Sequence, residues 1–316
     1  MGEFDLIAKY FTRESKRSDV LLGVGDDAAV LQVPPTRRLV AAVDTIVEGV
    51  HFPVDTVAAD IGYRALAVNL SDLAAMGAEP AWMTLSLSIP HADTAWLEQF
   101  ALGLYHLADQ HGVALVGGDT VRGPLSVTVQ ILGFVEADRW LTRRGAEPGD
   151  VVFVSGVPGE AAAGLAVLQR AIPPSSEAAH LIDRFLRPQP RLQLGRDLRK
   201  LASAAIDISD GLLADLSHIC NASRCGAHID MEAIPASASM RAIFSSAECE
   251  QMSLSGGDDY ELLFTANNES ILVVEAAIAA GVRCTPIGRI VEGDQVDCYR
   301  AGQKVAVERR GYNHFV

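Results

Sequence analysis

Two short stretches of the sequence each place a pair of aspartates between glycine and an apolar run. LLGVGDDAAVL contains Asp26 and Asp27, and SLSGGDDYELLF contains Asp258 and Asp259. Neighbouring carboxylates repel each other, and burying them costs free energy unless opposite charge or hydrogen-bond donors compensate. A chain that places such pairs at the edges of predicted strands therefore needs something positive beside them.

Other acidic residues recur at strand ends or in apolar surroundings, most of them beside glycine or a small hydroxyl residue. In AAVDTIVEGVHF, NLSDLAAMG, LVGGDT and AIDISDG they are Asp44, Asp72, Asp119, Asp207 and Asp210. Each has an ordinary structural interpretation as a turn former or a helix cap. Asp210 could cap a predicted helix that starts at Leu212, and Asp72 could pair with Asn69 on one helix face.

Divalent cations would remove the repulsion if these carboxylates converge in space. Mg²⁺ takes oxygen ligands and usually bridges carboxylates to the phosphates of a substrate. The pattern therefore favours Mg²⁺-dependent phosphate chemistry as a hypothesis, which requires the residues to meet in the fold.

The familiar phosphate-binding motifs are missing from the sequence. No lysine follows a glycine, so there is no Walker A loop, and neither a protein-kinase motif nor a Ser-His-Asp arrangement stands out. SGVPGEAAAG could present backbone amides to a phosphate, or could be a plain strand–turn–helix connection. The candidate phosphate contacts are Arg122, Arg139, Arg143 and Arg144, and His51 has the local sequence of a structural histidine.

Composition bounds the class of protein. With 316 residues, 49% of them hydrophobic, the chain has the length of two domains. A net charge of −14 gives no basic footprint for nucleic acid, and no apolar run reaches the length of a membrane span. The N-terminus, MGEFDLIAKYF, is unlike a signal peptide. Five irregularly spaced cysteines indicate reduced thiols, so we expect a cytoplasmic protein.

The predicted elements lack the strict strand–helix–strand rhythm of a doubly wound sheet. Residues 60–76 are predicted to form a helix with Asp60 as its N-cap, residues 20–31 a strand, and ALVGGDT a strand running into a glycine turn. RRGAEPGD, residues 143–150, indicates a domain boundary. We therefore predict an α+β fold with two mixed domains, residues 1–142 and 149–316.

Seven stretches occur in an order that is typical of one family. They are GVGDDAAV, DTIVEGVHF, YRALAVNLSDLAAMGAEPAW, GGDTVRGPL, LTRRGAEPGD, AIDISDGLLADL and SGGDDYELLF. On these motifs the chain resembles the thiamine-monophosphate kinases, within the superfamily of aminoimidazole ribonucleotide synthetase and selenophosphate synthetase. The resemblance runs from MGEFDLI to GYNHF, and DTIVEGVHF with the full ordered set is specific to the kinases.

The resemblance implies both an architecture and an activity. It implies two α+β domains, with the N-terminal domains of two chains pairing into a homodimer around a β-barrel with flanking helices. It also implies phosphorylation of thiamine monophosphate to thiamine diphosphate, with ATP as co-substrate and several Mg²⁺ ions. Neither nucleic acid nor membrane is an expected partner.

Site residues are carried over by motif. The resemblance implies Mg²⁺ ligands at Asp27, Asp44, Asp72, Asp119, Asp207 and Asp210. It implies ATP contacts at Gly118, Asp119, Arg143 and Ser209, with Tyr105 near the nucleotide. It implies a thiamine monophosphate site at His51, Asp258 and Tyr312. No residue is expected to act as an acid or base, because the metals and Arg143 would act electrostatically.

Three motifs depart from the family's pattern. Ala42 and Val43 stand where the family often has Ser-Thr, so any hydroxyl ligand there is lost. Val121 follows GGDT in place of threonine, and Asp258 replaces a glutamate, which shortens the arm but keeps the charge. No motif carboxylate is missing, and whether Asp26 is itself a ligand stays open.

Two other functions remain as alternatives. One is a different ATP-dependent synthetase of the same superfamily. Selenophosphate synthetase should carry a reactive cysteine or selenocysteine near its N-terminus, whereas the first cysteine here is Cys220. The other is a non-catalytic protein that binds a nucleotide or a divalent metal, which decayed metal ligands would favour.

Overall fold

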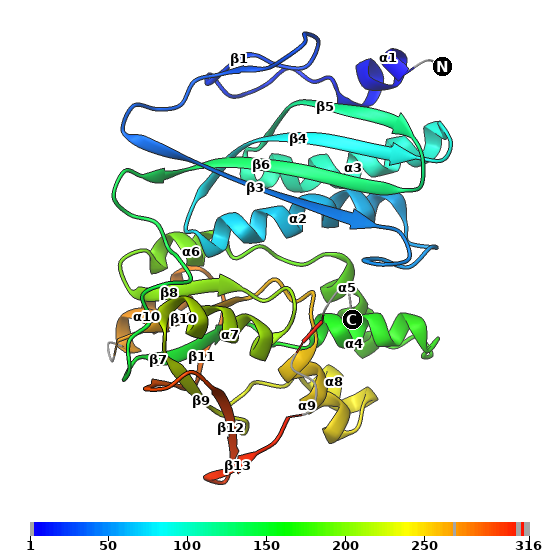
Figure 1. Ribbon diagram of the computed structural model, residues 1–316. Helices are drawn as coiled ribbons and strands as arrows, with labels where there is room; N and C mark the ends of the chain where they lie inside the picture. Colours follow the sequence, from blue (N-terminus) through cyan, green and yellow to red (C-terminus); the bar gives the residue numbers. More distant parts are fainter. Residues whose placement is uncertain (1–2, 268–269, 308–310, 313–316) are drawn as a thin grey trace. The chain divides into compact units, whose positions relative to one another are not determined.

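The chain folds into two compact units (Figure 1). The computed structural model describes residues 3–267, 270–307 and 311–312. Unit 1 comprises Met1–Leu73 and Ala78–Asp138, and unit 2 comprises Ala74–Gly77 and Arg139–Val316. Both units mix strands and helices, which confirms the mixed character expected of each half.

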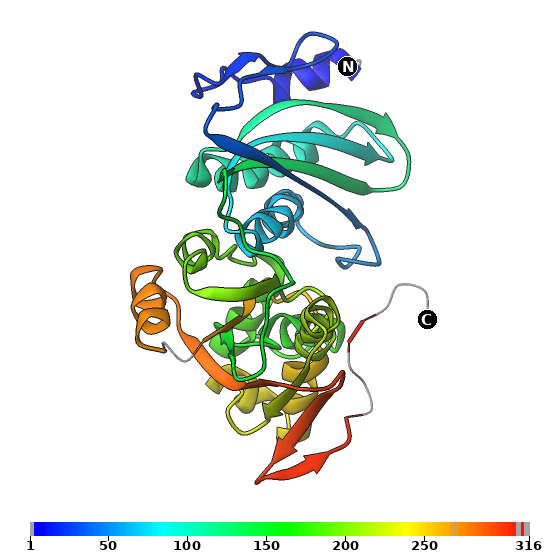
Figure 2. The ribbon, with the colours of Figure 1, turned by 60° about the vertical axis from the view of Figure 1, so that its left-hand side comes forward.

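Unit 1 is built around a four-stranded sheet with the strand order β3-β6-β4-β5. Its elements are α1 (Glu3–Leu6), the π-helix η1 (Ile7–Phe11), β1 (Val20–Leu22), β2 (Val30–Leu31), β3 (Arg37–Val47), α2 (Ala58–Ala75), β4 (Glu79–Ile89), α3 (Thr94–His111), β5 (Ala114–Arg122) and β6 (Ser126–Glu136). β4 and β5 are parallel and are joined through α3, whereas β6 pairs antiparallel with both β3 and β4. α2 and α3 pack together over one face of this sheet (Figures 1 and 2).

The predicted strand at residues 20–31 is in fact a short hairpin. β1 and β2 pair antiparallel, and residues 23–29 connect them. The hairpin is held to the sheet through Asp19, whose Oδ1 accepts a hydrogen bond from the indole N–H of Trp82 at 3.0 Å. Arg17 also binds Asp19 and, as the largest influence, holds the pKa of that carboxyl below its usual value. The loop that carries the first aspartate pair is thereby fixed beside the sheet.

Two local predictions in unit 1 need correction. α2 begins at Ala58, so Asp60 lies in the first helical turn, where its charge is still favourable, and is not the N-cap. The glycine pair of LVGGDT makes no turn, because β5 continues through it to Arg122. The reason is tight packing between strands: a Cβ on Gly118 would lie 1.9 Å from the carbonyl oxygen of Leu85.

The sheet of unit 1 is open, and no closed barrel is seen in the described residues. β3 forms one edge and β5 the other. Along β3 the burial alternates, with Val43 and Thr45 exposed and Ile46 buried. The predicted barrel needs a second chain and stays a prediction.

Unit 2 contains a seven-stranded sheet with the order β13-β12-β9-β11-β7-β10-β8. Its elements are β7 (Val151–Ser155), α4 (Glu160–Gln169), α5 (Ser176–Leu186), α6 (Leu192–Leu198), β8 (Ala202–Asp207), α7 (Leu212–Ser223), β9 (Gly226–Asp230), α8 (Ala238–Ile243), α9 (Ser246–Ser255), β10 (Leu262–Ala266), α10 (Ser270–Ala279), β11 (Cys284–Val291), β12 (Val296–Arg300) and β13 (Gln303–Val305). Its strands pair antiparallel except for β9 and β12. α7 packs on this sheet, and α4, α5, α8 and α9 share a second apolar cluster.

A charged side chain, Glu261, is buried at the start of a central strand of unit 2. β7 and β10 are buried along their whole length, and Glu261 directly precedes β10.

The five cysteines form no disulfide. None of the described helices combines the length and the apolar character that a membrane crossing needs.

Candidate functional site

A cavity of about 470 Å³ lies at the β5 edge of unit 1. η1, the hairpin loop and β5 line it, and Asp27, Gly118 and Asp119 are among its lining residues. Two segments that lie far apart in the sequence, the one with Asp27 and the one with Gly118 and Asp119, are therefore brought to one surface. The volume lies in the range of small-molecule binding sites.

The first aspartate pair is exposed on the wall of this cavity. Both side chains face solvent, and Asp26 Oδ1 accepts the backbone N–H of Asp27 at 2.9 Å. Among the described residues, no donor group is bonded to the carboxylates of Asp27 or Asp119. The pair is tolerated because it is hydrated, and two carboxylates on one wall leave oxygen atoms available to a cation.

Asp44 lies beside the helix face that carries Asp72. The backbone N–H of Asp44 donates to Asn69 Oδ1 at 3.0 Å, and Asn69 Nδ2 donates to the carbonyl of Ala65. Asn69 and Asp72 lie three residues apart and so share one face of α2. Burial raises the pKa of Asp44, which means that its charged form needs a counter-charge.

The departure at residue 43 falls on the other side of the sheet. Successive side chains of a strand point to opposite faces, so Ala42 shares a face with Asp44 and Val43 does not. Val43 is 58% exposed. A side chain at residue 43 therefore belongs to the exposed sheet face and not to the Asp44 site.

His51 stands in the turn that follows β3. Its ring Nδ1 accepts the backbone N–H of Val47 at 3.0 Å, and the backbone N–H of His51 donates to the carbonyl of Val47. The ring is thus held in one orientation, with Nδ1 as an acceptor.

Tyr105 does not line the cavity itself but contacts a residue that does. Its hydroxyl donates to the carbonyl of Phe11 at 3.1 Å, and Phe11 itself lines the cavity. The Arg13 guanidinium lies 3.5 Å from the centre of the Tyr105 ring. Burial raises the pKa of Tyr105 to about 12, so it stays protonated and acts as a hydrogen-bond donor.

Unit 2 brings five of the predicted site residues into one region. Asp207 ends β8, and Ser209 and Asp210 form the loop before α7. The N–H of Asp258 donates to the carbonyl of Ser209 at 2.9 Å, and the N–H of Tyr312 donates to the carbonyl of Asp210 at 3.0 Å. Residues predicted separately from three motifs are therefore joined by backbone hydrogen bonds.

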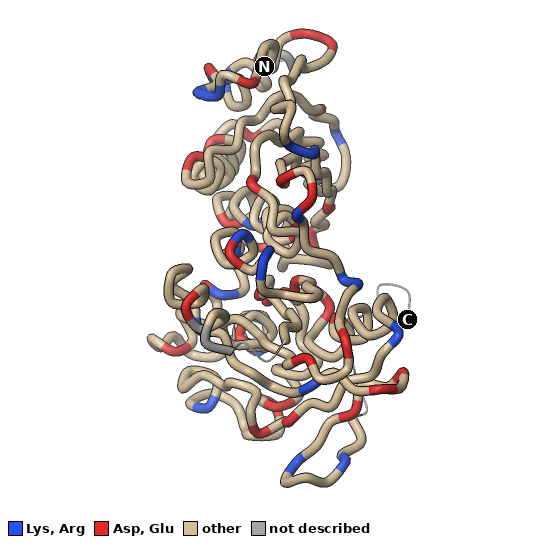
Figure 3. The backbone as a smooth tube through the Cα atoms, turned by 90° about the vertical axis from the view of Figure 1, so that its left-hand side faces the viewer, with Lys and Arg blue, Asp and Glu red and all other residues tan. Residues whose placement is uncertain are grey.

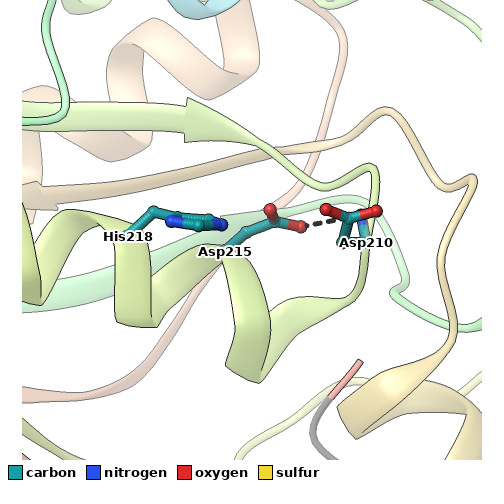
Figure 4. A group of neighbouring side chains, drawn as sticks. All are labelled: Asp210, Asp215 and His218. Carbon is teal, nitrogen blue, oxygen red and sulfur yellow. Dashed lines mark hydrogen bonds between the residues drawn. The ribbon is translucent and has the colours of Figure 1, made fainter. Parts of the chain in front are cut away.

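The loop before α7 is capped by a residue that the sequence analysis missed. The predicted cap, Asp210, makes no capping bond, and Gly211 is the N-cap residue. Asp215, in the first turn of α7, instead accepts the N–H groups of Ser209, Asp210 and Gly211, each at 3.1 Å. In Figure 4 a dashed line joins Asp215 to Asp210.

Charge accumulates around Asp215. Burial, and then the charges of Asp207 and Asp210, raise its pKa to about 7. Asp210, Asp215 and His218 each have one possible ligand atom that lies within 4.8 Å of those of the other two (Figure 4). His218 is exposed on α7, whereas Asp215 is buried.

The second aspartate pair has two different surroundings. Asp258 is half-buried at the site, and Tyr260 Oη donates to its Oδ1 at 3.3 Å. Asp259 is buried and accepts the N–H groups of Gly159, at 2.6 Å, and Ala161, at 3.1 Å. Its carboxylate therefore occupies the N-terminus of α4, which rules out the phosphate-binding interpretation of SGVPGEAAAG for these two amides. Burial raises the pKa of Asp259 well above its usual value.

Glu261 anchors the same segment through ion pairs. Its side chain is fully buried and binds Arg184 at 2.7 Å, the guanidinium of Arg191, and the hydroxyl of Ser155. Burial would raise the pKa of Glu261, but the two arginines outweigh it and hold the pKa below its usual value. Arg184 also lies 3.4 Å from Glu160. The ion pairs tie the α4 and α5 region to the start of β10.

Arg143 is not brought to the Ser209 loop. It is exposed, and its carbonyl accepts the hydroxyl of Ser223, the last residue of α7. Ser209 precedes the other end of α7, a helix of 12 residues, so the two backbones lie roughly 18 Å apart along its axis. The two predicted ATP contacts would therefore touch different parts of a ligand.

The sequence analysis assigned no role to three supporting residues, Asp215, Asp259 and Glu261. A signal existed for Glu261 and Asp215, since each is a charged residue within an apolar segment, YELLF and GLLADLSHI. Such residues are rarely buried without partners. Acidic and basic residues are spread over both units (Figure 3), so overall charge does not mark the site.

Comparison with known proteins gives the family. Residues 25–135 match the N-terminal domain of AIR synthase related proteins, and residues 147–300 match their C-terminal domain. The chain is 48% identical over 319 residues to thiamine-monophosphate kinase of Escherichia coli (strain K12), covering 99% of this chain and 98% of that protein. The chain belongs to the thiamine-monophosphate kinase family.

Solved structures of thiamine-monophosphate kinases have the same fold. The kinase of Stenotrophomonas maltophilia K279a superimposes with a TM-score of 0.87 at 46% identity, covering 92% of this chain and 93% of that chain. AaThiL complexed with AMPPCP and TMP superimposes with a TM-score of 0.80 at 33% identity, covering 92% of each chain.

The two buried carboxylates should differ in their effect on stability. Glu261→Gln removes the buried negative charge that pairs with Arg184 and Arg191, and only Arg184 keeps a second carboxylate, Glu160. We expect the substitution to lower the free energy of unfolding by about 3–5 kcal/mol at pH 7. Asp259→Asn removes a charge that burial already disfavours but keeps only one acceptor oxygen for the two N–H groups of Gly159 and Ala161, and we expect a smaller loss, below about 3 kcal/mol. Guanidinium unfolding followed by circular dichroism measures both.

The pH dependence of the stability follows from the direction in which the pKa of Glu261 is shifted. A carboxyl with a lowered pKa in the folded state stabilises the fold above its unfolded pKa of about 4.3 and loses this effect as pH falls. The gap between wild type and Glu261→Gln should therefore shrink below about pH 4. Equal losses for the two variants at pH 7 would contradict the ion-pair account.

Proposed function

We propose that this protein phosphorylates thiamine monophosphate to thiamine diphosphate, with ATP as the phosphate donor. The observation that carries the proposal is the cavity lined by Asp27, Gly118 and Asp119, which unites two motifs of the kinase family. The 48% identity with thiamine-monophosphate kinase of Escherichia coli, over 99% of this chain, supports the same activity. AaThiL complexed with AMPPCP and TMP is a structural relative that holds an ATP analogue with TMP.

The chemistry needs no general base. A phosphate monoester has a second pKa of about 6, so the acceptor oxygen is already largely deprotonated at neutral pH. The obstacle is repulsion between two polyanions, since unit charges at about 4 Å repel by roughly 4 kcal/mol at an effective dielectric of 20. The protein's task is therefore to position and neutralise, and we infer direct in-line transfer without a phosphoenzyme.

Several Mg²⁺ ions would supply the neutralising charge. The ligands that we propose are the carboxylates of Asp27, Asp44, Asp72, Asp119, Asp207 and Asp210. The fit is supported by the donor set: Asp27, Asp44, Asp119 and Asp210 offer oxygens to which no group of the described chain donates. When bound, Mg²⁺ would offset charge on the phosphates and on the group in transfer.

The remaining side chains would bind and orient the substrates. We propose that Gly118, Asp119, Arg143 and Ser209 contact ATP and that Tyr105 supports the nucleotide site through Phe11. His51, Asp258 and Tyr312 would form the thiamine monophosphate site. The fixed ring of His51 and the backbone bonds that join Asp258 and Tyr312 to the Ser209–Asp210 loop support these roles.

We also propose a homodimer formed through the sheet of unit 1. β3 has 11 residues and stands at the sheet edge, where its outer hydrogen-bonding groups can pair with another strand. On its open face Val43 is 58% exposed, and the hydroxyls of Thr45 and Thr128 lie 2.8 Å apart. A long edge strand with an apolar side chain at its centre suits strand pairing.

The activity is tested by phosphorus NMR of the purified protein with ATP, Mg²⁺ and either thiamine monophosphate or thiamine. We expect thiamine diphosphate and ADP to form only with the monophosphate. ADP and free phosphate without a diphosphate product would indicate a synthetase of the same superfamily. No ADP in either sample would indicate a protein that only binds.

Loss of one proposed metal ligand should impair the reaction but not the fold. Asp119→Asn removes a charge from the cavity wall, and we expect kcat to fall by at least about 100-fold, with more Mg²⁺ needed for half-maximal rate. The control is Asp93→Asn, an exposed aspartate that caps α3. Equal Mg²⁺ dependence and rates in both variants would exclude Asp119 as a ligand.

The dimer is tested at the centre of β3. Val43→Lys places a charge on the open sheet face, and we expect it to convert dimer to monomer in analytical ultracentrifugation. The matched control is Ile278→Lys, since Ile278 is 74% exposed on α10. A Val43→Lys protein that sediments as the wild type would show that this face is not the interface.

A further inference from the structure

One oxygen atom of Asp215 holds three consecutive backbone amides. Its Oδ2 accepts the N–H groups of Ser209, Asp210 and Gly211, all at 3.1 Å. The side chain is 2% exposed, so no solvent competes for these bonds. The carboxylate therefore fixes the path of the whole three-residue loop.

The same loop is fixed from its other side by carbonyl contacts. The carbonyls of Ser209 and Asp210 accept the N–H groups of Asp258 and Tyr312. Gly211 has a φ of +123°, and a Cβ there would lie 2.9 Å from the backbone of Ser255. Amides bound on one side and carbonyls on the other leave the loop little freedom, so the directions of the Ser209 and Asp210 side chains are set by the backbone.

Proximity alone would make Asp215 a metal ligand together with Asp210 and His218. The geometry argues against that role. Oδ2 already accepts from three donors, so a cation there would release three buried amides, and the second oxygen, Oδ1, belongs to a residue that is only 2% exposed. Asp210, in contrast, accepts no hydrogen bond through its side chain from any described residue.

We propose that Asp215 is a positioning residue for the phosphoryl transfer: it binds no metal and holds the backbone from which Ser209 and Asp210 reach ATP and Mg²⁺. This rests on the proposed function, because it takes over the roles assigned there to Ser209 and Asp210. Its consequence is that the acceptor atom of residue 215 matters more than the charge.

Two substitutions separate the two roles of Asp215. Asp215→Asn removes the charge but keeps an acceptor oxygen, and its amide would face the carboxylates of Asp207 and Asp210. Asp215→Glu keeps the charge but moves the acceptor by one methylene. A positioning residue should tolerate asparagine and not glutamate, whereas a metal ligand should tolerate glutamate better than asparagine.

The measurement is kcat/KM for ATP, with hydrogen exchange of the peptide that spans residues 207–212. We expect Asp215→Asn to lose less than about threefold, and Asp215→Glu and Asp215→Ala about 100-fold, as small displacements at a reacting group often cost. Exchange should become faster in residues 208–212 of the last two variants. The control is Ser175→Ala, which removes a one-bond cap from α5 and should leave kcat/KM unchanged.

Several results would overturn the proposal. The reversed order, with asparagine worse than glutamate, would make Asp215 a ligand. An equal loss in Ser175→Ala would reduce the effect to general stability. If the alanine and glutamate variants do not fold, asparagine decides: unchanged exchange in residues 208–212 with little loss of activity supports positioning, and a large loss of activity with unchanged exchange refutes it. An inactive wild type would refute the proposed function instead.

Discussion

Mutual repulsion of carboxylates is the constraint on which this structure depends. Acidic residues crowd around two loops of unit 2 and one cavity of unit 1, and each must find positive partners. Asp215 and Asp259 find them in backbone N–H groups, and Glu261 finds them in two arginines. Asp27 and Asp119 remain exposed on a cavity wall. The carboxylates thus divide into an inner set that the protein neutralises and an outer set that it leaves to solvent or a cation.

The inner set shapes the backbone that carries the outer set. Contacts of the buried side chains Asp259 and Glu261 hold the segment between Gly257 and β10 in place. Within it φ is positive at Asp258, +71°, and at Tyr260, +52°. Such angles are unfavourable for non-glycine residues and persist where surrounding contacts fix them. The result is that Asp258 is turned out toward the Ser209 loop while its neighbour is buried. Buried ion pairs contribute less to net stability than to this specific arrangement.

The sequence was sufficient for elements whose local pattern is strong and insufficient where tertiary contacts decide. Helix α7 was predicted to begin at Leu212, as it does, because an apolar helix follows a glycine. The prediction of a glycine turn at Gly118 was wrong, because glycine is required there by the close approach of the Leu85 backbone on the neighbouring strand. Asp27 and Asp119 were proposed for one site, and the fold places both on one cavity wall. Asp215 stands out in the sequence as a charge within an apolar segment, but its role was missed because its partners are backbone amides, which the side-chain identities of a sequence do not reveal.

The division into two sets is tested most directly by the thermal stability of the nucleotide-free protein in MgCl₂ and in NaCl of equal ionic strength. A ligand that binds only the folded state stabilises it in proportion to RT ln(1 + [L]/Kd). If the outer carboxylates form cation sites, millimolar Mg²⁺ should raise Tm well beyond the effect of Na⁺, with a saturating dependence on concentration. Identical shifts in the two salts would mean that Mg²⁺ only screens charge, and the account of the outer set would be wrong.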